Sequence, residues 1–323
     1  TLPILYRYNS LIKTTSYYIK KEVMMGTEKG KKNIIKPMVV AEHCCNHKGS
    51  VDTAMQMIKE ASLAGADYAK FQKWYPKESL TDEHYNSPHP DMAQSFGEPY
   101  GIHRENLEFD VSIHKDLQKY CEEVGIGYSS SAFDMTSLKQ IITLNPDYIK
   151  IPSQKNTVLD FYPVLANEFD GDVHVSTGMT SDAEINIILE HLDKNNLLER
   201  TVLYSATSCY PCPHDQIHLL RISKFCDLYG DLVKAIGFSG HHNGIAPDIA
   251  ALALGARYFE RHFTLDRTMK GTDQAASLEP QGLMKLCRDL VNVDLGLTNR
   301  PDGILDSEMH NYKKVKSGEG KLI

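Results

Sequence analysis

Three features of this sequence predict an α/β fold, namely a closed (β/α)₈ TIM barrel. Eight short apolar runs each end in polar residues, and amphipathic stretches separate most of them. This alternation is typical of parallel strands joined by crossover helices. Eight strands favour a closed barrel over an open doubly wound sheet. No GxGxxG or GxxxxGK[ST] motif occurs that would indicate a nucleotide-binding fold.

The predicted strands follow one another at short intervals. Each reads as the apolar run expected of a strand that is buried on both faces of a parallel sheet. Polar residues gather where these strands end, and (β/α)₈ barrels keep their chemistry at that edge. The predicted strands are residues 38–43, 67–72, 127–132, 147–152, 173–178, 201–207, 234–239 and 257–263.

Amphipathic stretches between the strands are predicted to form helices. Ser50 precedes the first of them and Asp215 the sixth, where a side-chain oxygen can cap free backbone N–H groups. The predicted helices are residues 51–64, 112–124, 137–144, 160–166, 183–192, 217–226 and 247–254.

A long loop at residues 73–111 follows the second strand and is rich in Pro, Gly, Tyr and His. A loop of this length without secondary structure is usually functional in a compact domain. Because it follows a barrel strand, we expect it to lie over the mouth of the site. The alternative is a decoration with no part in the site.

Composition and charge set the domain organisation. The 323 residues, 41% of them apolar, can bury one large core, and a net charge of −7 with both signs interspersed argues against a nucleic-acid partner. No apolar stretch is long enough for a membrane span, and seven cysteines indicate free thiols in a reducing cytoplasm. We predict a flexible extension at 1–37, the barrel at 38–300, and a tail or truncated linker at 301–323.

Two lysines, Lys70 and Lys150, close apolar strands. A lysine inside a parallel sheet is costly unless an anion or a partner meets it, so the pair indicates a pocket for a phosphate and a carboxylate. The alternative is that each lysine snorkels out from its strand end. The hydroxyls expected beside them are Ser129, Ser130, Ser131, Ser153, Ser176 and Thr177.

Glu42 ends the first strand, where its carboxylate could act as a general base, orient a lysine or form a buried salt bridge. Burial would raise the pKa of Glu42 and a neighbouring Lys70 would lower it, and the sequence leaves the sign open. His47, in the loop that follows, is either a catalytic acid or ligand, or a hydrogen-bonded loop anchor.

Residues 239–244 form the expected metal-contact region, because His241 lies there at a strand end. An imidazole at a barrel mouth can coordinate a divalent ion, which then polarises a carbonyl. In the eighth strand, alternation sends Glu260 and His262 to one side and Arg261 to the other. Either set could face the interior.

The cysteines offer two further patterns, the CxxC spacing of Cys209 and Cys212 and the adjacent pair Cys44 and Cys45. A zinc or redox site would need a second pair nearby in rigid geometry. Because the first and sixth strands lie far apart around a barrel, we expect no cysteine metal site.

Together these residues resemble the sialic acid (N-acetylneuraminate) synthase family over roughly residues 38–295. The first-strand motif is Ala41-Glu42-x-x-x-Asn46-His47-x-Gly49. The other matching motifs are Gly65-Ala66-Asp67 with Lys70-Phe71-Gln72, His103-Arg104, Lys150 with Ser153, Ser176-Thr177-Gly178, Thr207-Ser208 with Tyr210-Pro211, Ser239-Gly240-His241, Glu260-Arg261-His262, and Asp273 before Ala276-Ser277-Leu278-Glu279-Pro280.

The resemblance implies that phosphoenolpyruvate (PEP) condenses with an open-chain N-acetylated hexosamine (N-acetylmannosamine or its 6-phosphate) to give a nonulosonic acid and phosphate. By this resemblance Glu42 handles protons, and His241 holds a divalent metal, Mn²⁺ or Mg²⁺, that activates the aldehyde. Gln72 and Asp273 would contact the sugar, and Tyr210 would bind substrate. The residues expected to bind PEP are Lys70, Ser131, Lys150, Ser153 and Ser176.

The chain departs from the family pattern in three places. Ser205 stands where many members have a second metal-ligand histidine, so the metal would rest on His241, substrate oxygens and water. Gln154 and Lys155 replace a glycine and an acidic residue. The C-terminal antifreeze-like domain of the family is not expected within these residues.

Two alternative functions remain open. One is a synthase for legionaminic or pseudaminic acids, and the other is a barrel that binds a phosphorylated ligand without turnover. The family also implies a homodimer, and the free thiols predict a cytoplasmic location.

Overall fold

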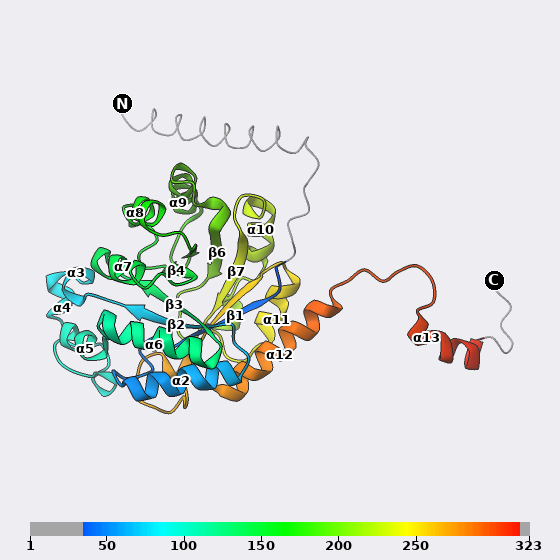
Figure 1. The fold of residues 1–323 in the computed structure, drawn as a ribbon, viewed down its shortest axis with the longest axis horizontal. Coiled ribbons are helices and arrows are strands. Elements are labelled where there is room, and N and C mark those ends of the chain that lie inside the picture. Colours follow the sequence, from blue (N-terminus) through cyan, green and yellow to red (C-terminus); the bar gives the residue numbers. More distant parts are fainter. Residues whose placement is uncertain (1–34, 317–323) are drawn as a thin grey trace. The chain divides into compact units, whose positions relative to one another are not determined.

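A computed structural model describes residues 35–316, in which eight parallel strands close into a barrel in sequence order (Figure 1). The predicted (β/α)₈ fold is confirmed, and each strand begins and ends within two residues of its predicted position. The strands are β1 (Met38–Glu42), β2 (Tyr68–Lys73), β3 (Gly127–Ala132), β4 (Tyr148–Ile151), β5 (Asp172–Ser176), β6 (Thr201–Ala206), β7 (Ala235–Gly240) and β8 (Tyr258–His262).

Each strand is followed by a helix of the outer layer, and the seven predicted helices are confirmed. An eighth, α12, was not predicted, although Leu283, Leu286 and Leu290 bury one face at helical spacing. The outer helices are α2 (Val51–Leu63), α6 (Val111–Val124), α7 (Met135–Ile142), α8 (Phe161–Glu168), α9 (Asp182–Lys194), α10 (Leu220–Tyr229), α11 (Ala246–Ala253) and α12 (Pro280–Gly296).

The two predicted caps have opposite outcomes. Ser50 accepts a hydrogen bond from the backbone N–H of Thr53, as expected of the residue that starts α2. Asp215 does not cap α10, so that prediction was wrong. It lies inside a short 3₁₀ turn, His214–Gln216, and α10 begins only at Leu220.

The long segment after β2 carries its own secondary structure, so the prediction of a loop without any was wrong. It contains α3 (Pro76–Ser79), α4 (Asp82–Tyr85), a 3₁₀ turn (Met92–Gln94) and α5 (Tyr100–Leu107). Two carboxylates fix its start: Glu108 accepts from the Trp74 backbone at 3.0 Å, and Asp134 accepts from the Tyr75 backbone at 2.6 Å. Trp74 also stacks on Phe133, with ring centroids 3.8 Å apart.

The interior of the barrel is polar and aromatic, so the strands are not apolar on both faces. Residues such as Phe71 and Ile149 point outward into the apolar layer beneath the helices. Inside, Tyr148 stacks on His174 with centroids 3.6 Å apart, and Tyr204 and Tyr258 pack around the same imidazole. These rings fill the barrel below the charged residues at the carboxyl ends of the strands.

The chain ends extend beyond the described residues. The predicted extension at 1–37 falls almost entirely within 1–34, outside the described part. Of the predicted tail at 301–323, the described part includes α13 (Asp306–Asn311) and a π-helical turn (Tyr312–Lys316). Within residues 35–316 no helix combines the length and apolar character needed to cross a membrane. All seven cysteines are free.

Candidate active site

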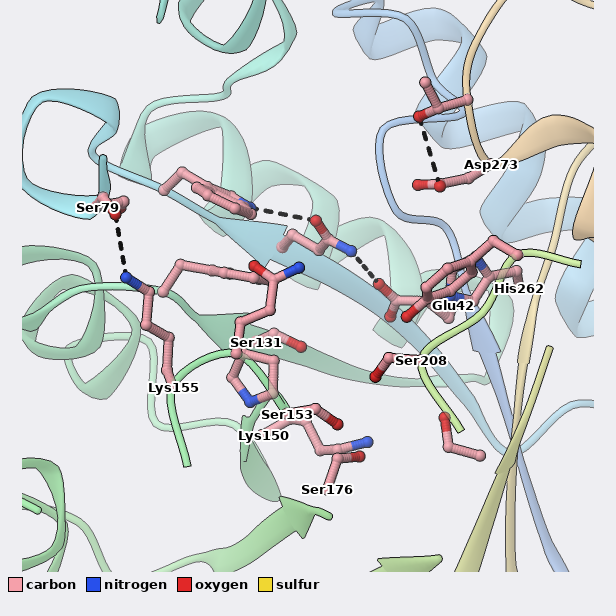
Figure 2. Close-up of a pocket in the computed structure, with 18 of the residues that line it drawn as sticks. Glu42, Ser79, Ser131, Lys150, Ser153, Lys155, Ser176, Ser208, His262 and Asp273 are labelled. Carbon is pink, nitrogen blue, oxygen red and sulfur yellow. Dashed lines mark hydrogen bonds between the residues drawn. The ribbon is translucent and has the colours of Figure 1, made fainter. Parts of the chain in front are cut away.

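A cavity of about 610 Å³ opens at the carboxyl ends of the strands (Figure 2). The long segment after β2 contributes Trp74, Ser79, Tyr100 and Arg104 to its wall, so the expectation that this segment is part of the site is confirmed, and it is not a mere decoration. The ten residues predicted to catalyse or bind substrate all line this one cavity: Glu42, Lys70, Gln72, Ser131, Lys150, Ser153, Ser176, Tyr210, His241 and Asp273.

Two lysines and two glutamates form the floor of the pocket. Lys70 is in a salt bridge with Glu42, its neighbour in register across β1 and β2, and lies 3.7 Å from Glu260. Lys150 Nζ donates to Glu260 Oε2 at 2.7 Å and lies 3.9 Å from the centre of the Tyr204 ring. The lysines therefore do not snorkel outward, because carboxylates of the barrel interior meet both of them.

The four floor residues titrate differently. Burial raises the pKa of Glu42, and Lys70 opposes the rise only in part. Burial acts on Glu260 in the same direction, but Lys150 and Lys70 together hold the pKa of Glu260 well below its usual range. Burial lowers the pKa of Lys150 to about 8. Two carboxyls with pKa values pushed apart suit one to carry a proton and the other to stay ionised.

Three of the six expected hydroxyls line the pocket. Ser131 accepts from Lys70 at 2.8 Å, Ser153 accepts from the Gly178 backbone at 2.9 Å, and Ser176 lies beside them (Figure 2). The other three, Ser129, Ser130 and Thr177, donate to backbone carbonyls instead and do not line the cavity.

His241 directly follows β7, is buried and lines the cavity. Its Nδ1 lies 2.7 Å from the Thr207 carbonyl oxygen, which can only accept, so Nδ1 carries the proton and Nε2 keeps its lone pair. Burial lowers the pKa of His241 to about 4, so the ring is neutral at pH 7. The rings of Tyr210 and His262 lie 4.2 and 5.0 Å from it.

The structure decides which side of β8 faces inward. Glu260 and His262 line the cavity, whereas Arg261 is fully buried on the opposite face beside α11. Arg261 forms a salt bridge with Asp248 and donates to the Gly244 carbonyl at 2.9 Å. It therefore anchors the loop that follows β7 and His241.

Two residues considered from the sequence lie outside the cavity. His47 stacks on Phe109 with centroids 4.3 Å apart and accepts from the Gly49 backbone, which fits the loop-anchor interpretation. Ser205 pairs in register with Phe238, a residue of the outer apolar layer, so it faces away from the pocket. It therefore contributes no ligand atom to the cavity as described.

Sequence reasoning missed part of the site. Glu260 was left as one of two options, although it is the carboxylate shared by both lysines. Lys155 lines the cavity and donates to the Ser79 carbonyl at 3.1 Å, on the side away from Glu42 and Asp273 (Figure 2). Arg104 lies over Trp74, 4.1 Å from the ring centre, and only its motif indicated a role.

One group of potential metal ligands lies beside the floor. The ligand atoms of Cys44, His262 and Asp273 all lie within 4.8 Å of one another. The expectation of no cysteine metal site compared the first strand only with the sixth. In the closed barrel β1 pairs with β8, which brings Cys44 to His262.

The closed barrel and the charged pocket at its carboxyl end define a (β/α)₈ protein of the kind that binds ligands above the strand ends. A family model described as the NeuB family matches residues 57–300. The chain belongs to this family, the sialic acid synthases, as its motifs indicated.

The relatives agree with this assignment. The chain is 35% identical over 293 residues to human N-acetylneuraminate-9-phosphate synthase, covering 88% of this chain and 80% of that protein. It is 31% identical over 289 residues to the N,N'-diacetyllegionaminic acid synthase of Campylobacter jejuni, covering 89% and 84%. A solved N-acetylneuraminic acid synthetase from Leptospira borgpetersenii is 25% identical, with a TM-score of 0.73 and coverage of 91% and 98%.

Proposed function

We propose that this protein is a PEP-dependent synthase that condenses PEP with an N-acetylated hexosamine to give a nonulosonic acid and phosphate. The observation that carries the proposal is the buried floor of two lysines and two carboxylates beneath three hydroxyls. Family membership supports the same reaction, since the relatives are named as synthases of sialic and legionaminic acids.

PEP binding is assigned to the floor. Lys70 and Lys150 supply the positive charge, and Ser131, Ser153 and Ser176 supply hydroxyls that can bind carboxylate or phosphate oxygens. Because Glu42 contacts Lys70 and Glu260 contacts Lys150, both lysines are held in position before PEP arrives. A site that needs no rearrangement loses less free energy on binding.

In the proposed reaction C3 of PEP bonds to the aldehyde carbon of the open-chain sugar, and the aldehyde oxygen becomes a hydroxyl. Water adds at C2 of PEP, and phosphate leaves with the bridging oxygen by C–O cleavage. Glu42 is the proton carrier, because burial raises its pKa while Glu260 stays ionised. Gln72, which donates to Glu42 at 2.9 Å, is assigned to the sugar together with Asp273 and Tyr210.

A divalent cation, when bound, would polarise the aldehyde carbonyl as a Lewis acid. His241 suits such an ion, because its ring is neutral and its Nε2 lone pair remains after Nδ1 has bonded to Thr207. Coordinating imidazoles commonly have their second nitrogen fixed in this way.

We further propose that the acceptor carries a phosphate, as in N-acetylmannosamine 6-phosphate. Four cationic side chains line the cavity against three carboxylates: Lys70, Arg104, Lys150 and Lys155 against Glu42, Glu260 and Asp273. Among the described residues no carboxylate lies within salt-bridge distance of Lys155. A phosphate at the far side of the cavity would meet this ammonium group.

The prediction for the assembly remains a homodimer located in the cytoplasm.

The test uses PEP labelled with ¹⁸O at the bridging position, together with N-acetylmannosamine, its 6-phosphate and other N-acetylhexosamines. We expect phosphate release that depends on the acceptor, with the label in phosphate. A label retained in the organic product would refute C–O cleavage. Folded protein that binds PEP but releases no phosphate with any acceptor would instead indicate a barrel that only binds its ligand, and turnover with another N-acetylated sugar would point to the legionaminic or pseudaminic branch.

A further inference from the structure

Three side chains from different elements meet at the seam between β1 and β8. Cys44 follows β1, His262 ends β8, and Asp273 lies in the segment before α12. Cys44 Sγ lies 3.1 Å from His262 Nδ1, and every pair of ligand atoms in the group lies within 4.8 Å. Cys44 and His262 are buried, and His262 and Asp273 both line the cavity (Figure 2).

These separations match the dimensions of a metal site. Zinc binds sulfur at about 2.3 Å and nitrogen or oxygen at about 2.0–2.2 Å, so tetrahedral ligands lie roughly 3.3–3.7 Å from one another. The observed group needs shifts of about 1 Å or less to surround an ion. A thiolate and a carboxylate with a neutral imidazole also balance the charge of a divalent cation.

The three donors have weak partners at present. Cys44 Sγ lies 3.7 Å from the Glu42 carbonyl oxygen as well as 3.1 Å from His262 Nδ1. Asp273 has no salt-bridge partner within 4 Å among the described residues, and its carboxylate accepts from the Cys45 thiol at 3.7 Å and from the Thr272 hydroxyl at 3.5 Å. Cys44 adopts φ +47°, a left-handed conformation that a non-glycine residue rarely takes. Such a conformation places the thiol against His262 at a backbone position where glycine would be easier to accommodate.

We propose that Cys44, His262 and Asp273 form a three-ligand site for a thiolate-preferring divalent cation such as Zn²⁺, with its fourth position open to the cavity. Sulfur ligands favour Zn²⁺, Co²⁺ and Fe²⁺ over Mg²⁺ and Mn²⁺. Three protein ligands and one open position are typical of catalytic rather than structural zinc sites. His241 is not one of these three ligands, so this ion is separate from the one that His241 would hold. That the ion takes part in turnover rests on the proposed function, whereas its binding does not.

The binding test needs no substrate. The 323-residue chain is freed of metal with a chelator and titrated with Co²⁺, and the near-ultraviolet thiolate-to-cobalt charge-transfer band is recorded. We expect one Co²⁺ per chain with a band that Zn²⁺ displaces and a large excess of Mg²⁺ does not. Cys44→Gly, which suits φ +47°, should abolish the band and weaken binding by at least about tenfold, in the range seen when metal-site partners are removed.

The adjacent thiol provides the matched control. Cys45→Ser should keep the band, and His262→Gln should lose it while the protein remains folded by circular dichroism. A band that survives Cys44→Gly, a band lost only in Cys45→Ser, or no Co²⁺ binding by the wild type would each overturn the site. If Co²⁺ binds through Cys44 but no acceptor releases phosphate from PEP, the site stands and the proposed function fails. The reverse result leaves the function standing without this site.

Discussion

Replacing Lys150 by methionine separates the structural and functional roles of the pocket floor. Methionine keeps most of the side-chain volume but removes the ammonium group that donates to Glu260 at 2.7 Å. Glu260 then keeps only Lys70, at 3.7 Å, as a cationic partner. The variant thus leaves the buried Glu260 carboxylate with the Ser239 hydroxyl at 3.2 Å and one more distant cation.

The expected magnitudes follow from burial. Removing one partner of a buried ion pair costs about 3–5 kcal/mol of stability. An unfolding entropy of about 2.1 cal/mol/K per residue gives about 0.6 kcal/mol/K for the roughly 280 described residues. The thermal unfolding midpoint should therefore fall by about 5–8 °C. PEP loses a desolvated charge contact worth about 2–5 kcal/mol, which weakens binding about 30- to 5,000-fold.

Scanning calorimetry and PEP titration calorimetry measure the two effects, with exposed Lys285→Met as the control. Adding Glu260→Gln to Lys150→Met leaves Lys70 paired with Glu42 and removes the unpaired carboxylate. The thermal unfolding midpoint of the double variant should therefore lie above that of Lys150→Met, whereas its PEP affinity should stay as low. If Lys150→Met bound PEP within about threefold of wild type, Lys150 would not hold the anion. A double variant less stable than the single one would refute the charge-balance argument.

Three further predictions concern other parts of the barrel. His43→Phe should stabilise the fold by about 1–2 kcal/mol, because both ring nitrogens are buried without partners among the described residues. Burial lowers the pKa of His43 to about 3, so the wild type loses stability as pH falls from 6.5 toward 3. Denaturant unfolding at pH 7 and pH 5 should therefore show that His43→Phe gains more unfolding free energy over wild type at pH 5. No gain at either pH would contradict the argument. Arg261→Lys should lower the unfolding free energy by about 2–4 kcal/mol, with Arg300→Lys as an exposed control; equal midpoints would contradict it. Lys155→Ala should raise KM at least about tenfold for a phosphorylated acceptor and spare the unphosphorylated one, whereas equal effects would exclude phosphate recognition by Lys155.

The fold could be predicted because the helices bury apolar faces at regular spacing and polar residues mark the strand ends. What failed was the expectation that both faces of each strand are apolar. The interior residues Tyr148, His174 and Tyr204 satisfy one another through stacking and hydrogen bonds, as between His174 Nδ1 and the Tyr204 hydroxyl at 2.9 Å. Polarity of this kind depends on partners from other strands, which no single segment reveals.

The site residues could be predicted where the strand ends carry chemistry that the apolar runs do not explain. All ten substrate and catalytic candidates meet in one cavity, but their partners were less accessible to sequence reasoning. Glu260 required knowing which face of β8 turns inward, and Lys155 required knowing that the segment after β4 approaches α3. Cys44 required treating the first and last strands as neighbours, which is true only in a closed barrel.

Closure of the barrel thus has a chemical consequence at the β1–β8 seam. Glu42 pairs in register with Lys70 on one side and with His262 on the other, so the proposed proton carrier lies between the anion pocket and the proposed metal ligands. A cation at Cys44, His262 and Asp273 would add positive charge near Glu42 and lower its pKa. PEP, which draws on the charge of Lys70 and Lys150, would act in the opposite direction. Because each ligand changes the charge around the same carboxyl group, their binding energies must be coupled through it, and reciprocally. The protonation state of Glu42 therefore depends on whether PEP and the cation are bound beside it. Its raised pKa applies to the protein without these ligands.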